Sequence, residues 1–229
     1  ISEQREKLEE LEKRKETILA SIEKQDKLTP ELKEKIESTF SATELEDMYL
    51  PYKPKRKTRA SVAKEKGLEP LAQQIFEQRG GNVHETAKTF LSEKVETVED
   101  ALQGARDIIA EMINENRRAR MSIRRLFGRN AVIKSKVVKD KEEEAQKYKD
   151  YFAYEEPLKK CRSHRLLAMR RGEKEGFLRL SVFPPEDEAI ENLEKIFIKN
   201  SAAHFTENED KAAFHVKTAI KDGYKRLLQ

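Results

Sequence analysis

The sequence predicts a mainly α protein: an elongated multi-helix bundle with a helix-turn-helix-like unit and two or three short strands. Charged residues make up 39% of the 229 residues and hydrophobic residues 37%, a balance typical of long helices with one solvated side. Eight glycines and no tryptophan argue against a β-sandwich or barrel, which would need many turns. Capping residues followed by apolar residues at helical spacing recur along the chain.

The first predicted helix covers residues 2–25 and carries a narrow coiled-coil seam. The seam positions are Leu8, Leu11, Lys15, Ile18 and Ile22. Because such a stripe must be hidden, we expect this helix to pack back on the rest of the chain or against another copy.

Two short helices are expected next. Thr29-Pro30 combines a cap residue with a proline suited to the first helical position, and the helix it begins should bury Leu32, Ile36 and Phe40. A capping box at residues 41–44 begins another helix, whose inner face carries Leu45, Met48 and Tyr49.

The stretch at residues 49–70, which we call the strap, links these helices to the rest. Pro51 and Pro54 lack amide donors, so residues 49–57 are predicted to be extended. Thr58 should cap a short helix that Gly67 ends. Either the strap's tyrosines and prolines brace neighbouring helices while its cations stay in water, or the cations contact phosphates.

The middle of the chain predicts four helices. One covers residues 68–76 and is stopped by Gly80-Gly81, and the next begins after Asn82. A longer helix after Thr97 has a wide apolar face, which places it at the centre of the bundle. Asn116 either breaks this helix or caps the next, at residues 117–127, which Gly128 should end. A strand at residues 131–138 follows, and together these elements resemble a winged helix-turn-helix, although many such units bind no DNA.

The last third predicts helices around one strand. We expect a charged helix at residues 141–152, a helix from Ser163 to Arg171, a strand at 177–183 and a helix after Pro184-Pro185. A capping box at residues 206–209 should begin the final helix. We divide the chain into a helical, coiled-coil-like segment at 1–48, a helical domain with the strap and helix-turn-helix-like unit at 49–160, and a helix-strand-helix segment at 161–229.

Two blocks of sequence resemble a known family. YLPYKPKRKTRA followed by AKEKGLEPLA, and SHRLLAMRRGEKEGFLRL at residues 163–180, are similar to the N-terminal region of the bacterial Tex family of transcription accessory proteins. The resemblance covers the chain from roughly Leu8 onward. It implies a larger protein with RNase-H-like, helix-hairpin-helix and OB-type RNA-binding domains, none of which occurs here, and the family's PFIARYRKE-like opening motif is also missing. We therefore expect a piece of a longer chain, with RNA binding credited in the family largely to the OB-type domain.

Positive charge is segregated along the chain. Residues 53–66 hold seven basic residues and one acid, 117–139 nine and none, and 159–174 seven and one. These stretches carry +21 against +4 for the whole chain, which leaves −17 elsewhere. They could form a polyanion-binding face, or they could pair with the acidic segments. The candidate nucleic-acid-binding residues are Lys53, Lys55, Arg56, Lys57, Arg59, Arg117, Arg118, Arg120, Arg124, Arg125, Arg129, Arg165, Arg170 and Arg171.

Residues for other chemistry are sparse. The four histidines lack a metal-ligand spacing, and the single Cys161, although near His164, is more simply a bystander than an activated thiol. No phosphate-binding loop, signal peptide or membrane-length apolar run is found, and a lone cysteine suits a reducing cytoplasm. We predict no enzyme activity and no cofactor or metal.

The expected function is weak, non-specific contact with RNA or DNA phosphates, with the transcription machinery as a further partner. The alternative is a structural or protein-interaction scaffold that positions downstream nucleic-acid-binding domains.

Overall fold

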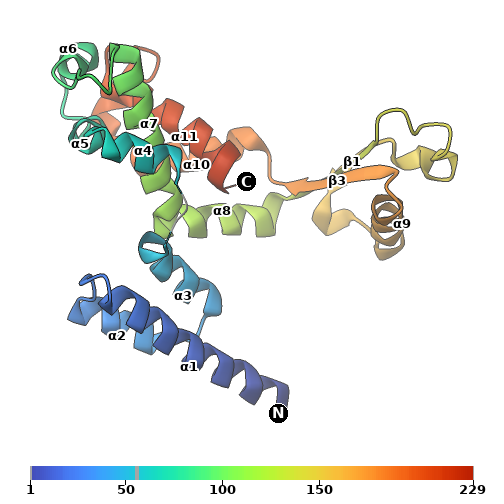
Figure 1. Ribbon diagram of the computed structural model, residues 1–229. Coiled ribbons are helices and arrows are strands. Elements are labelled where there is room, and N and C mark those ends of the chain that lie inside the picture. Colours follow the sequence, from blue (N-terminus) through green and yellow to red (C-terminus); the bar gives the residue numbers. More distant parts are fainter. Residues whose placement is uncertain (1, 55–56, 229) are drawn as a thin grey trace.

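The computed structural model describes residues 2–54 and 57–228, and its architecture is mainly helical, as predicted (Figure 1). Three parts extend in different directions from one central region. Helices α1 (Ser2–Glu23), α2 (Pro30–Ser38) and α3 (Ala42–Tyr49) form an arm, a helical body surrounds α7 (Val98–Glu115), and a small sheet lies apart from both. Helix α8 (Arg117–Asn130) connects the body with the sheet. The division of the sequence into three segments stays a prediction.

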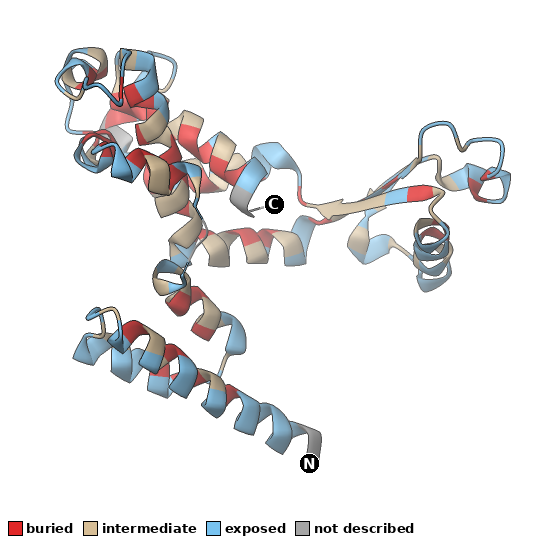
Figure 2. Ribbon diagram, in the orientation of Figure 1, coloured by how far each residue is buried: buried red, intermediate tan, exposed pale blue. Residues whose placement is uncertain are grey.

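The arm and the body have separate hydrophobic cores (Figure 2). In the arm, α1 packs back on α2 and α3 through four of its five seam positions, and Lys15 is buried there because its ammonium donates to Glu12 and to the Glu37 carbonyl, both at 2.8 Å. Leu8, the fifth position, is 51% exposed.

The predicted burial of Phe40 is wrong, because its side chain is 78% exposed. Helix α2 ends at Ser38, so Phe40 lies in the turn beyond it and not on its inner face. The ring lies 5.3 Å from the Lys15 ammonium.

The strap is partly helical, which corrects the prediction of an extended segment. Leu50–Tyr52 form a 3₁₀ turn, η1, that continues from α3. Pro51 fits there because its fixed φ, about −65°, is compatible with a 3₁₀ turn. Beyond it, Thr58 and Ser61 form a reciprocal capping box for α4 (Arg59–Glu65), and Gly67 follows with a φ of +81°, as its helix-ending role requires.

The body is built around α7, whose buried face confirms its predicted central place. It packs against α4, α5 (Glu69–Glu77), α6 (Val83–Lys88) and α11 (Ala212–Gly223), while α10 (Glu186–Phe197) packs on α8 and α11. A π-helical turn, Tyr224–Leu228, follows α11. Helix α5 ends at Gln78, which adopts a φ of +48° before the two glycines.

The predicted capping box at residues 206–209 is wrong, because α11 begins only at Ala212 and no side chain caps it. Residues 206–211 are turns that fold back on the helix. Glu207 pairs with Lys217, and the Glu209 carbonyl lies 2.8 Å from Nε2 of His215. These contacts hold the turns against α11.

Strands β1 (Val132–Val137), β2 (Ala153–Pro157) and β3 (Leu178–Phe183) form an antiparallel sheet with the order β2-β1-β3. Helix α9 (Ser163–Lys174) covers the face that carries Ile133 and Ser135. On that face its Arg165 contacts Tyr154 and Glu156, the partners of Ser135 and Ile133 in the register.

Three local predictions around the sheet are wrong. Helix α8 runs through Gly128, since a glycine can keep ordinary helical angles at a modest cost. Residues 141–152 form turns and a 3₁₀ helix, η2 (Gln146–Tyr151), because Asp140 turns the chain with a φ of +65° and β2 must begin at once beside β1. Helix α9 is capped by the backbone of Arg162, while Ser163 is its first residue.

Two helical glycines provide a test of the packing between α9 and the sheet. An added methyl group at Gly172 would lie 2.6 Å from Cδ1 of the buried Leu178, so Gly172→Ala should lower the free energy of unfolding by about 1–3 kcal/mol. At Gly128 nothing lies within 4 Å, so Gly128→Ala should raise it by about 0.5–1 kcal/mol. Urea unfolding of both variants checks this; equal effects would contradict the close approach of α9.

Candidate nucleic-acid interface

Helix α8 carries six arginines in its 14 residues. Asn116 both ends α7 and caps α8, because its side chain accepts a hydrogen bond of 3.1 Å from the Ala119 amide. Ala119, Ile123 and Leu126 are buried on one stripe of the helix. The arginines therefore lie on its two flanks, one toward α3 and one toward α10.

The α3 flank forms an ionic junction with the arm. Nε of Arg120 and Nη2 of Arg124 each donate to Oδ1 of Asp47 at 2.6 Å, and Nη1 of Arg124 donates to Oδ2. The Asp47 side chain is only 2% exposed. Burial alone would raise the pKa of this carboxyl group, but the hydrogen bonds from Arg124 and Arg120 outweigh burial and hold the pKa below its ordinary value.

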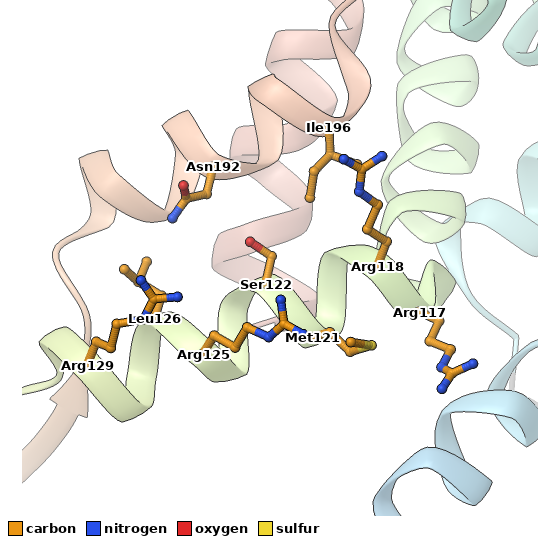
Figure 3. Close-up of a pocket in the computed structure, with 9 residues that line it drawn as sticks. All are labelled: Arg117, Arg118, Met121, Ser122, Arg125, Leu126, Arg129, Asn192 and Ile196. Atoms are coloured by element: carbon orange, nitrogen blue, oxygen red, sulfur yellow. The ribbon is translucent and has the colours of Figure 1, made fainter. Parts of the chain in front are cut away.

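Arg117 extends this junction, since its guanidinium lies 3.0 Å from Glu44 at the start of α3. In Figure 3 it points away from the other labelled arginines.

The α10 flank of α8 faces an open groove of about 740 Å³ (Figure 3). Arg118, Arg125 and Arg129 are exposed and make no ion pair with any residue in the described part of the chain. Asn192 and Ile196 of α10 form the opposite side, and no carboxylate of the described residues lines the groove. The lining consists of Arg117, Arg118, Met121, Ser122, Arg125, Leu126, Arg129, Asn192 and Ile196.

The strap adjoins the junction rather than the groove. Lys53 is exposed and lines a second cavity, of about 450 Å³, together with Arg120 and Arg124. Lys57 lies 3.7 Å from Glu65, and Arg59 is exposed at the start of α4. The candidates Lys55 and Arg56 lie outside the described residues.

The candidates on α9 lie elsewhere. Arg165 donates to the Tyr154 hydroxyl at 2.8 Å and lies 3.3 Å from Glu156, so it serves the packing of α9 on the sheet. Arg170 pairs with Glu173, and Arg171 is exposed. Helix α9 lies against the sheet at the far end of α8 (Figure 1), so its arginines are not part of the groove beside α10.

Asp47 is the residue of this region that the sequence did not indicate, and it decides where two of the candidate arginines are held. Its signal is slight: the spacing of Arg120 and Arg124, one helical turn apart, lets two guanidinium groups reach the same carboxylate. Nothing near Asp47 in the sequence indicates where those two cations lie.

Groups for catalysis or metal binding are limited in the structure. Among the described residues, no three or more histidine, cysteine or acidic side chains are grouped to hold a metal ion. Burial, and then the Glu156 carboxylate, raises the pKa of the Cys161 thiol, which disfavours a reactive thiolate. Every helix in the described ranges is too short or too polar to cross a membrane.

Comparison with known proteins identifies similar chains. A family model described as Tex central region-like matches residues 79–228. The chain is 42% identical over 233 residues to Uncharacterized protein YdcI of Bacillus subtilis, covering 100% of this chain and 31% of that protein. It is 40% identical over 191 residues to Transcriptional accessory protein Tex of Neisseria gonorrhoeae, covering 83% and 25%.

A further relative is Protein YhgF of Escherichia coli, which is 45% identical over 177 residues, covering 76% of this chain and 23% of that protein. The chain thus spans less than a third of the length of these relatives.

Proposed function

Since this chain belongs to the Tex central region-like family, we propose that it is a non-catalytic, nucleic-acid-binding region of a transcription accessory protein. The Neisseria relative is named a transcriptional accessory protein, which supports the setting. The contacts would be made to RNA or DNA phosphates without sequence specificity. The observation that carries the proposal is the groove between α8 and α10, where arginines are exposed and the described lining holds no carboxylate.

The chemistry of the groove suits phosphates. Arg118, Arg125 and Arg129 recur along one flank of α8, and a guanidinium can donate two parallel hydrogen bonds to a phosphate. Ser122 and Asn192 add uncharged polar groups between them. A row of cations along an open groove follows a backbone and does not by itself read base edges, so affinity should be similar for different sequences.

The two flanks of α8 have different tasks in this proposal. Arg120 and Arg124 already donate to Asp47, so this carboxylate offsets part of their charge and holds both guanidinium groups in place. The groove arginines carry charge that no described side chain balances. Phosphate binding is therefore assigned first to the groove, with Lys53 and Arg59 of the strap as outlying contacts.

A triple variant tests the groove. Arg118→Ala/Arg125→Ala/Arg129→Ala should weaken binding of a labelled duplex DNA for all sequences alike, from a starting dissociation constant of about 10⁻⁴–10⁻⁶ M at physiological salt. The log–log dependence of affinity on salt should become shallower by up to about 2.7, because each phosphate that the protein binds contributes roughly 0.9. Fluorescence anisotropy between 50 and 300 mM salt measures both quantities.

The matched control removes three exposed lysines from the arm, Lys13, Lys24 and Lys27, and so changes the net charge equally. If both triple variants change the salt dependence alike, overall charge rather than the groove governs binding.

The scaffold is the second candidate function, and the ionic junction favours it. Asp47, Arg120 and Arg124 fix the arm on α8, which in turn carries the sheet, so the three parts are held in a defined arrangement. Such a frame could position downstream domains or contact the transcription machinery. If the groove variant folds and binds DNA as well as the wild type does, the scaffold is the one candidate function that remains.

A further inference from the structure

The face of the sheet opposite α9 carries two cations directly beside one another. Along β1, Ile133 and Ser135 are buried while Lys134 and Lys136 are exposed, so alternate side chains point to opposite faces. The register places Lys136 opposite Arg179 of β3, which is also exposed. Both side chains therefore project from the face that α9 leaves uncovered, which we call the open face.

This arrangement is unfavourable for folding by itself, because like charges directly opposite one another destabilise a sheet. Neither Lys136 nor Arg179 forms an ion pair within the described part of the chain. The residue opposite Lys136 on the other neighbouring strand is Ala153. By contrast, Lys134 faces Glu155 in the register and lies 3.0 Å from its carboxylate. The sheet thus balances one lysine and leaves the adjacent pair unbalanced.

The open face continues onto α8 through an aromatic contact. Phe183 shares this face with Arg179, two strand repeats away, and its ring meets that of Phe127 edge-on with centroids 6.0 Å apart. Phe127 lies one helical turn beyond Arg124 and lines a surface cavity with it. The open face thus carries the unbalanced cationic pair and Phe183, whose ring contacts Phe127 of α8, and neither phenylalanine lines the groove.

We propose that the open face is a second nucleic-acid site, at which Lys136 and Arg179 bind the phosphate backbone of a single strand. The inference rests on the proposed function only for the identity of the polyanion. A phosphate between the two cations would be attracted to both and would offset their mutual repulsion. The ligand would thus provide the negative charge that the fold does not place there. Single-strand sites commonly combine such cations with aromatic side chains, and Phe183 with Phe127 supplies these.

The variant Lys136→Glu separates folding from binding, because it converts the repulsive pair into an attractive one. Its melting temperature should stay equal or rise by up to about 4 °C. Its affinity for a labelled single-stranded RNA should fall, and the log–log salt dependence should become shallower by about 0.7 for each phosphate that the variant no longer binds. Lys136→Arg should keep wild-type binding.

Lys149→Glu is the matched control, since Lys149 is exposed in η2 and the change in net charge is the same. The proposal is wrong if Lys136→Glu weakens RNA binding no more than this control does, or if Lys136→Glu melts at a lower temperature than the wild type.

The groove variant distinguishes the two sites. Loss of RNA affinity in Lys136→Glu, with unchanged affinity in Arg118→Ala/Arg125→Ala/Arg129→Ala, would support the open face and exclude the groove as the site for single-stranded RNA, while the duplex DNA titration tests the groove separately. The reverse result would refute the open face. Poly-glutamate is a second probe: if its binding depends on Lys136 while RNA binding does not, the surface serves an acidic protein segment and the proposal fails.

Discussion

Replacing Arg120 and Arg124 together by alanine should lower the free energy of unfolding by about 3–5 kcal/mol. The Asp47 carboxylate, 2% exposed, would then be left between α3 and α8 without the guanidinium groups that balance it. Removing the partners of a buried charge costs more than the pair contributes, because the remaining charge has lost its water as well. Urea unfolding followed by circular dichroism measures the loss.

The control lies on the same helix. Arg118→Ala/Arg125→Ala removes two arginines from the exposed flank of α8 and should change the free energy of unfolding by no more than about 0.5 kcal/mol. Similar losses in the two double variants would mean that helix propensity or net charge, and not the junction, is responsible.

The pH dependence of stability provides a second test of the junction. The lowered pKa of Asp47 stabilises the wild type above the unfolded pKa of about 3.9, and this contribution is lost as pH falls through the folded pKa. In Arg120→Ala/Arg124→Ala, burial without the two cations should instead raise the pKa of Asp47. Protonation of Asp47 then removes the buried, unpaired charge and stabilises the folded variant. The difference in free energy of unfolding between the wild type and the variant should therefore become smaller from neutral pH toward about pH 4. If this difference in free energy of unfolding does not change with pH, the variant has lost packing contacts and not an ionic interaction.

Tyr49→Ala should be the other strongly destabilising change, lowering the free energy of unfolding by roughly 2–4 kcal/mol. Tyr49 is 8% exposed at the end of α3, its hydroxyl lies 2.9 Å from Oγ of Ser21, and the Arg14 guanidinium lies 5.5 Å from its ring centre. It therefore joins α1 to the start of the strap. Urea unfolding checks the loss.

Tyr49→Phe keeps the ring and removes only the hydroxyl group, so its cost should be about 0.5–1.5 kcal/mol. Tyr52→Ala should cost less than Tyr49→Ala because Tyr52 is only half-buried. If Tyr49→Ala were no worse than Tyr49→Phe, the ring would not brace the strap.

Five helix starts were predictable from sequence because a cap is a local interaction, whereas the caps predicted at Ser163 and at residues 206–209 are wrong. Thr29, Ser41, Thr58, Asn82 and Thr97 each accept a hydrogen bond from the backbone amide three residues later, as their positions before apolar runs indicated. Predictions failed where distant contacts decide the local structure. Residues 141–152 have helical composition, but the pairing of β2 with β1 requires a compact turn there.

The sequence predicted which cations the candidate interface contains, but not which of them form ion pairs within the protein. The basic stretch at 117–139 is visible in the sequence, yet Asp47 lies 73 residues before Arg120 and 77 before Arg124. Which arginines are balanced within the protein therefore depends on tertiary structure. The same holds for Lys136 and Arg179, whose proximity follows only from the strand register.

The separate hydrophobic cores of the arm and the body affect how the chain opens. Because the two cores share no buried residue and the junction at Asp47 links α3 to α8, the arm can open while the body stays intact. Cooperativity across the chain is then set by the junction at Asp47. Amide protons of α1 and α2 would exchange through a local opening of lower free energy than those of α7, and Arg120→Ala/Arg124→Ala would lower it further.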